Sequence, residues 1–150
     1  MIEVRFYKEA DDALLRFAVI IARSRGKWVF CKHRERDTWE IPGGHREPGE
    51  DILDTAKREL YEETGAVDYD LRELGIYSVV RGEGTAAEES FGMLYFAEIR
   101  EFETELHHEM ERIVLSGQLP ERWTYPEIQP RLMEKFMTDE KESENLGTGF

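Results

Sequence analysis

Three glutamates near the middle of the chain have a spacing that suits metal binding. Glu59, Glu62 and Glu63 stand at i, i+3 and i+4, so in a helix their carboxylates share one face within about one turn. These like charges repel one another, and a divalent cation between them would remove that cost. Oxygen ligands without a cysteine or histidine set favour Mg²⁺, with Mn²⁺ as a substitute. The alternative is an acidic helix face that contacts only solvent.

The residues around this cluster predict a glycine loop followed by a helix. Pro42, Gly43 and Gly44 interrupt regular structure, and the two glycines permit a tight turn and close backbone approach. Apolar or small side chains then recur at helical spacing and should face the core. They are Leu53, Ala56, Leu60 and Thr64. Gly65 follows at the position of a C-terminal cap.

From Gly44 onward, the segment resembles the Nudix box, with each defined position filled. The match reads Gly44, five residues, Glu50, seven residues, Arg58-Glu59-Leu60-Tyr61-Glu62-Glu63-Thr64-Gly65 and a small apolar residue, Ala66. The last position prefers a larger aliphatic side chain, so Ala66 is a soft departure that should affect packing more than chemistry. The segment from Trp39 to Gly44 also looks like the one that usually enters the box.

The resemblance implies a reaction, in which water attacks a phosphorus atom of a diphosphate linkage with the assistance of Mg²⁺. By similarity to the family, the carboxylates of Glu59, Glu62 and Glu63 and the carbonyl of Gly44 would ligate the metal. The general base would be Glu62, Glu63 or an acid from a later loop. The family therefore implies a set of candidate bases and no single one.

Glu50, Arg58 and Gly65 receive supporting roles by the same similarity. Glu50 and Arg58 would form an ion pair that holds the loop to the helix. Arg58 could also influence the neighbouring carboxylates, so it is counted among the candidate catalytic residues. Gly65 would serve the structure of the box.

Substrate contacts are expected from Gly43, Gly44 and Trp39. The glycines allow close backbone approach. Trp39, Trp123 and Tyr125 could each stack on a base, although packing in a core or loop is the more common role of such rings.

An acid from a later loop often completes the metal site in this family. Five candidates precede a predicted strand over residues 112–115, namely Glu101, Glu103, Glu105, Glu109 and Glu111. Glu109 is favoured because a carboxylate just before a strand could reach the sheet surface, while solvent exposure is the more common fate of any one of them. His107 and His108 lack further ligands and are interpreted as surface residues or substrate contacts.

Composition limits the classes of protein that this chain can represent. Its 150 residues, 40% of them hydrophobic, suit one domain. A formal charge of -13 disfavours a DNA-binding surface. Cys31 is the single cysteine of the chain, so an intramolecular disulfide is excluded. We expect it to be a buried, inert thiol. Neither a signal peptide nor a membrane span is expected, so the predicted location is the cytoplasm.

Hydrophobic patterns predict a mixed α/β (α+β) fold. Strands are expected at 2–6, 15–22, 28–31, 71–80, 91–102 and 110–115, with a hairpin turn over 24–27 and a second helix over 127–137 introduced by Pro126. Too few helices separate the strands for a doubly wound sheet, so we expect a mixed β-sheet flanked by helices. That order is similar to the Nudix α/β/α sandwich over residues 1–137, and residues 138–150 are expected to form a disordered acidic tail.

The chain lacks two sequence signatures of particular substrates, and their absence limits the range of candidate substrates. Arg81 stands where a proline would suggest ADP-ribose, and Gly82 and Glu83 stand where a tyrosine would suggest dinucleoside polyphosphates. The chain is similar to MutT-type enzymes that convert a nucleoside triphosphate to a monophosphate and pyrophosphate. Alternatives are removal of pyrophosphate from the 5′ end of RNA, a non-catalytic nucleotide-sensing module and a plain acidic structural domain.

Overall fold

The computed structural model describes the backbone of residues 1–103 and 110–147. Eight strands form one sheet, and two α-helices and two 3₁₀ turns accompany it. The strands are β1 (Ile2–Tyr7), β2 (Leu15–Ser24), β3 (Lys27–His33), β4 (Trp39–Glu40), β5 (Gly43–His45), β6 (Ala66–Arg81), β7 (Glu88–Phe102) and β8 (Met110–Ser116). The other elements are α1 (Ile52–Thr64), α2 (Gln129–Gly147), η1 (Asp12–Leu14) and η2 (Gly84–Ala86).

The sheet is mixed, as the hydrophobic patterns predict. Its order is β1-β6-β7-β2-β3-β4, with β5 paired to β2 and β8 paired to β3. Strands β2 and β7 run parallel, and the other pairs are antiparallel. The hairpin turn between β2 and β3 is also confirmed, because Arg25 and Gly26 have φ values of 54° and 77°.

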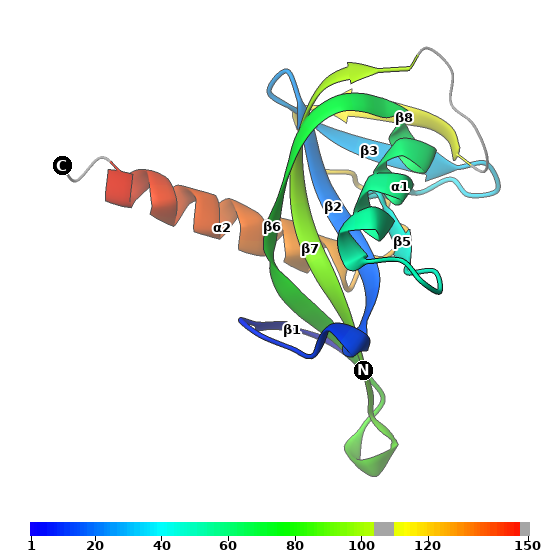
Figure 1. Cartoon of the computed structure of the whole chain (residues 1–150), viewed down its shortest axis with the longest axis vertical. Coiled ribbons are helices and arrows are strands. Elements are labelled where there is room, and N and C mark those ends of the chain that lie inside the picture. The colour runs from blue at the N-terminus through cyan, green and yellow to red at the C-terminus, as the bar shows by residue number, and fades with distance from the viewer. Residues whose placement is uncertain (104–109, 148–150) are drawn as a thin grey trace.

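Two cores lie on opposite faces of this sheet. Figure 1 shows α1 on the near face and α2 behind the sheet, with the end of α2 extending past its edge. Because side chains alternate along a strand, Ile20 of β2 joins the core under α1, while Val19 and Ile21 join the core under α2. The expected α/β/α sandwich is therefore confirmed.

Helix α1 buries Ala56, Leu60 and Thr64 as its sequence predicts, but Ile52 takes the place expected for Leu53. Ile52, Ala56, Leu60 and Thr64 are buried at intervals of four residues. Leu53 was expected on this face, but it is 42% exposed. The prediction was wrong because Leu53 is about 100° around the helix from Ile52, which points at the sheet. The cap at Gly65 is confirmed by a φ of 76° and an N–H that donates to the Tyr61 carbonyl.

The glycine pair forms a strand, where the sequence predicts a loop. Gly43 and Gly44 belong to β5 and pair with Val19 and Ala18 of β2. A Cβ on Gly43 would lie 2.6 Å from the Ala18 carbonyl oxygen. The missing side chain therefore permits close packing against β2, which the prediction of a loop did not anticipate.

Helix α2 is longer than expected and begins later. It spans Gln129–Gly147, so the backbone as far as Gly147 is helical where a disordered tail was predicted. Two ion pairs support this extension: Arg23 contacts Glu140 at 3.2 Å, and Lys135 contacts Asp139 at 3.1 Å. No helix among the described residues combines the length and apolar composition that a membrane crossing requires.

Candidate functional site

The last turns of α1 lie against β5, which places the acidic cluster beside the glycine strand. Glu59 packs so closely on Gly44 that a Cβ there would lie 2.4 Å from the Glu59 carboxyl carbon. The Glu59 side chain is 13% exposed and that of Glu62 is 35% exposed. The helical spacing thus brings carboxylates to one side of α1, and packing on β5 orients one of them.

Arg58 connects the loop, the strand and the acidic cluster. Its Nε donates to Glu50 at 2.6 Å, and its Nη2 donates to the His45 carbonyl at 2.9 Å. Its Nη1 lies 2.8 Å from Glu59 and 3.2 Å from Glu62. The expected Glu50–Arg58 ion pair is present, and the same guanidinium also reaches two of the proposed metal ligands.

Glu50 is held by three donors at the start of α1. Besides Arg58, the backbone N–H of Glu47 and the Thr55 hydroxyl donate to its Oε1, each at 2.9 Å. The bond from Arg58 is the main cause that lowers the pKa of Glu50 from 4.5 to about 2. A carboxylate whose pKa is lower in the folded state than in the unfolded chain stabilises the folded state at pH values above its pKa in the unfolded chain. This stabilisation is lost as the pH falls through the pKa of the folded state.

We therefore expect Glu50→Gln to lower the free energy of unfolding at pH 7 by about 2–3 kcal/mol. The gap between wild type and variant should shrink by more than half at pH 3, because protonation of the unfolded chain removes part of the wild-type advantage. Urea unfolding at pH 7 and at pH 3 measures this difference in the free energy of unfolding. A gap of equal size at pH 3 would contradict the role given to the ion pair.

Glu63 faces away from Arg58, toward the sheet. Its Oε2 accepts from the Gly43 N–H at 3.1 Å and from the Cys31 thiol at 3.6 Å. Desolvation, followed by the nearby charge of Glu59, raises the pKa of Glu63 well above its usual value. Cys31 is fully buried, as expected, and desolvation raises the pKa of its thiol. Glu63 is thus held in a region with surplus negative charge.

The donor set fits a hard divalent cation in its chemistry. Glu59, Glu62 and Glu63 offer carboxylates, and Gly44 offers a backbone carbonyl next to the Glu59 carboxylate. Among the side chains that the structure describes, those of residues 1–103 and 113–143, however, no three acidic, histidine or cysteine side chains converge on one point. Arg58 contacts Glu59 and Glu62 but also Glu50, so its single positive charge offsets only part of theirs, while Glu63 points to Gly43. Burial, and after it the nearby charge of Glu59, raises the pKa of Glu63, and a bound cation would compensate this charge.

The two glycines should respond differently to alanine. Gly43→Ala forces a Cβ into the β2 backbone, so we expect the free energy of unfolding to fall by about 2 kcal/mol. Gly44→Ala instead displaces the Glu59 carboxylate, so catalysis should fall more than stability does. Chemical unfolding and steady-state kinetics of both variants measure this difference. Equal losses of stability would contradict it.

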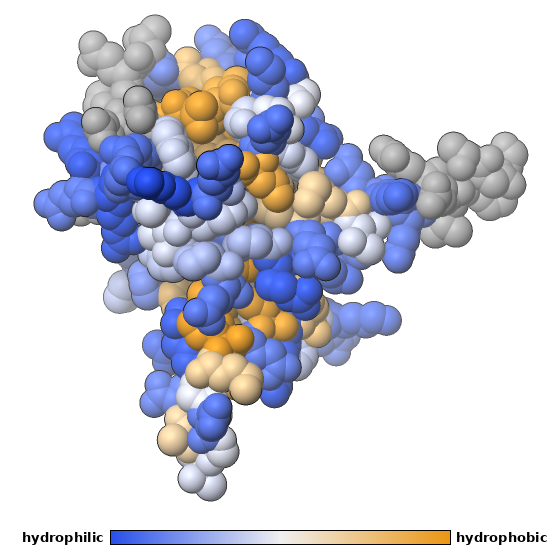
Figure 2. Space-filling model, turned by 180° about the vertical axis from the view of Figure 1, so that it is seen from behind, coloured by the Kyte–Doolittle hydropathy of each residue, from blue (hydrophilic) through white to orange (hydrophobic). Residues whose placement is uncertain are grey.

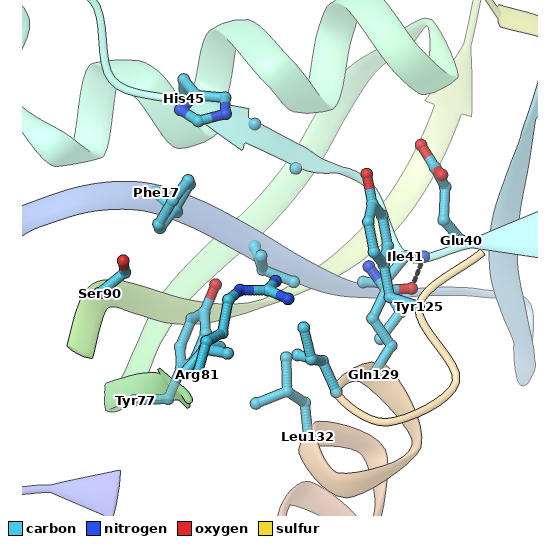
Figure 3. A pocket seen from close by; sticks show the side chains of 15 residues that line it. Phe17, Glu40, Ile41, His45, Tyr77, Arg81, Ser90, Tyr125, Gln129 and Leu132 are labelled. Carbon is cyan, nitrogen blue, oxygen red and sulfur yellow. Dashed lines mark hydrogen bonds between the residues drawn. The ribbon is translucent and has the colours of Figure 1, made fainter. Parts of the chain in front are cut away.

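A cavity of about 350 Å³ opens beside the glycine strand, a size within the range of small-ligand sites (Figure 3). Glu40, Gly43, Gly44 and His45 line it on the side of α1. The other lining residues are Phe17, Val19, Ile41, Tyr77, Val79, Arg81, Ser90, Tyr125, Ile128, Gln129 and Leu132. On this side of the molecule, apolar surface gathers below the middle among hydrophilic side chains (Figure 2).

Several lining residues could not be identified from sequence motifs. Glu40 is a buried carboxylate whose Oε2 has no hydrogen-bond partner among the described residues, and desolvation raises its pKa. Arg81 and Gln129 come from β6 and α2, far from the box in sequence. Of the aromatic candidates, Tyr125 lines the cavity, whereas Trp39 lines a separate hollow beside Arg122. The only signal for Tyr125 was its aromatic side chain.

Neither of the later acids whose side chains are described, Glu101 and Glu103, lines this cavity. Glu103 accepts from the Tyr61 hydroxyl at 2.8 Å, and Glu101 is exposed at the end of β7. Glu109, the favoured candidate, lies outside the described residues together with Glu105, His107 and His108. The side chain of Glu111 is also outside them. The prediction that Glu109 completes a metal site therefore stays a prediction.

Comparison with known proteins adds independent findings. A profile of the NUDIX domain matches residues 13–136. YtkD of Bacillus subtilis (strain 168), whose name describes a candidate 8-oxo-dGTP diphosphatase, is 38% identical over 103 residues, covering 68% of this chain and 62% of that protein. An RNA pyrophosphohydrolase of Psychrobacter sp. (strain PRwf-1) is 35% identical over 57 residues, covering 38% of this chain and 33% of that protein.

A solved structure is similar along nearly the whole chain. The crystal structure of the Bacillus subtilis pyrophosphohydrolase BsRppH aligns with a TM-score of 0.74 and 27% identity, covering 93% of this chain and 90% of that one. The sequence matches to the two curated relatives, by contrast, span less than two thirds of their lengths.

Proposed function

The chain belongs to the NUDIX family, and from this premise we propose that it hydrolyses the diphosphate linkage of a nucleotide, with a (d)NTP converted to monophosphate and pyrophosphate. One observation carries the proposal: Glu59 and Glu63 of α1 contact Gly44 and Gly43, and these two glycines line a cavity of about 350 Å³, within the range of small-ligand sites. Charge stabilisation and recognition of the nucleoside can therefore occur in adjoining parts of one site.

Mg²⁺, or Mn²⁺ in its place, would be held by Glu59, Glu62, Glu63 and the Gly44 carbonyl, where it would supply charge stabilisation for the phosphates. Glu62 and Glu63 are the candidate bases within the described residues, and one of them would accept the proton of the attacking water. The Gly43 N–H orients Glu63 through a 3.1 Å hydrogen bond. Arg58 supports the site by holding Glu50 and positioning Glu59.

The triphosphate substrate is proposed from similarity to the MutT type and from the name of YtkD. Removal of pyrophosphate from the 5′ end of RNA is a second candidate, favoured by the likeness to BsRppH. A formal charge of -13 weakens long-range attraction to RNA more than attraction to a small nucleotide, whose charge is partly neutralised by its own cation. A cytoplasmic location belongs to the same proposal, since a single buried cysteine suits a reducing compartment.

Hydrolysis of a deoxynucleoside triphosphate with Mg²⁺ in ¹⁸O-labelled water tests the proposal. We expect monophosphate and pyrophosphate as the primary products, with the label in pyrophosphate if water attacks the β-phosphorus. Label in the monophosphate would place the attack at the α-phosphorus. Orthophosphate and a nucleoside diphosphate as primary products would contradict the proposed reaction. Parallel assays with triphosphorylated RNA compare the second candidate, and nucleotide binding without turnover of either substrate would indicate a non-catalytic module.

A further inference from the structure

Arg81 brings a positive charge to the cavity without an internal partner. It is the last residue of β6, and strand alternation places it on the same face as Tyr77 and Val79, which also line the cavity. Glu88 stands opposite Arg81 in the β6–β7 ladder, yet the structure contains no ion pair between them. The Arg81 guanidinium forms no hydrogen bond with any described residue, so its N–H donors remain available to a ligand.

Gln129 presents a second donor whose orientation is set by the backbone. Its Oε1 accepts from the Ile41 N–H at 2.8 Å, and its side chain is buried at the start of α2. This bond leaves the amide nitrogen as the group that Gln129 can offer, and that nitrogen forms no hydrogen bond with another described residue. In Figure 3, the ends of Arg81 and Gln129 extend toward one another across the cavity.

The surroundings of these donors suit a flat, largely apolar ligand. Val19, Ile41, Val79 and Leu132 provide apolar walls, and Tyr125 is 41% exposed at the opening. If the diphosphate lies beside Gly43 and Gly44, as the proposed function requires, the base of the same nucleotide extends toward Arg81. A base that satisfies two converging donors must present acceptors along one edge.

We propose that Arg81 and Gln129 select guanine through its O6 and N7 acceptors, an inference that rests on the proposed function. An arginine fork matches these two acceptors, whereas adenine replaces O6 with an N–H₂ donor and pyrimidines lack the N7 acceptor. In 8-oxoguanine, N7 carries a hydrogen and becomes a donor that faces the guanidinium. The site therefore favours dGTP over dATP and also over 8-oxo-dGTP.

Steady-state kinetics with dGTP, 7-deaza-dGTP, 8-oxo-dGTP and dATP test this selection in wild type and Arg81→Gln. In the wild type, we expect kcat/KM for dGTP to exceed the other three by about tenfold or more. In Arg81→Gln, the advantage of dGTP over the other three should fall to about threefold or less, because the fork that contacts O6 and N7 is lost and glutamine can pair with adenine instead. Arg100→Gln is the matched control, since Arg100 lies on β7 and pairs with Asp68 and Asp70.

Binding of dGMP and dAMP, measured by calorimetry in EDTA, separates base selection from catalysis. We expect tighter binding of dGMP by the wild type and equal binding by Arg81→Gln. Arg81→Lys retains the charge and can still donate to O6 and N7 but lacks the planar fork, so it should reduce the preference without abolishing it; it serves in addition if Arg81→Gln does not fold. If Arg81→Gln weakens the binding of both nucleotides equally and Arg81→Lys restores it, the proposal is overturned. That result would indicate that Arg81 contacts the phosphate. An unchanged preference in both variants would overturn it as well, whereas absence of hydrolysis of any nucleotide would count against the proposed function.

Discussion

Glu63→Gln is expected to lower kcat by about 100-fold to 10,000-fold, the range lost when a general base or a charged ligand of the reacting group is removed. Glutamine retains the shape of the side chain and can still accept from the Gly43 N–H. It also removes a charge that is buried and that opposes Glu59, the two causes, burial first, that raise the pKa of Glu63. The melting temperature should therefore stay the same or rise while activity is lost.

Glu62→Gln provides the comparison within the cluster. The kcat of this variant should also fall strongly. Its stability should change little, because the Glu62 side chain is more exposed and its contact with Arg58 at 3.2 Å contributes little to stability. Glu83→Gln is the control for the loss of one negative charge, because Glu83 is exposed and precedes η2. The interpretation would be wrong if Glu63→Gln kept full activity, or if it lost activity only in proportion to unfolding.

Removal of divalent cations is expected to abolish hydrolysis. Glu59, Glu62 and Glu63 repel a polyphosphate, and Arg58, the cation among them, is already bonded to Glu50. Kinetics after treatment with EDTA, followed by addition of Mg²⁺ or Mn²⁺, measure the effect. Full turnover after exhaustive chelation would contradict the metal-dependent mechanism.

A second measurement of the same site does not depend on turnover. Mg²⁺ that binds only the folded protein stabilises it by RT ln(1 + c/Kd), where c is the Mg²⁺ concentration, and so raises its melting temperature as the concentration passes Kd. We expect a rise at millimolar Mg²⁺ in the wild type and a smaller rise in Glu59→Gln, which loses one proposed ligand. Identical rises in both proteins would remove Glu59 from the ligand set.

The sequence by itself determined the features that depend on neighbours within a few turns of one helix. The spacing of Glu59, Glu62 and Glu63 predicts a shared face because helical geometry repeats every 3.6 residues. The cap at Gly65 follows from its ability to adopt a positive φ, which the structure gives as 76°. The mixed sheet between helices was likewise predictable, because alternating and helical patterns mark strands and helices separately.

Only the tertiary structure decided which residues meet at the cavity. Arg81, Tyr125 and Gln129 lie far from the box in sequence, and the pairing of β6 with β7 and the packing of α2 bring them to Gly43 and Gly44. Packing of α1 on the other face of the sheet buries Glu63 against Cys31, and β4 leaves Trp39 beside another hollow. Local periodicity specifies the face of an element, but it contains no information on which distant element covers that face, because that choice depends on packing of the whole sheet.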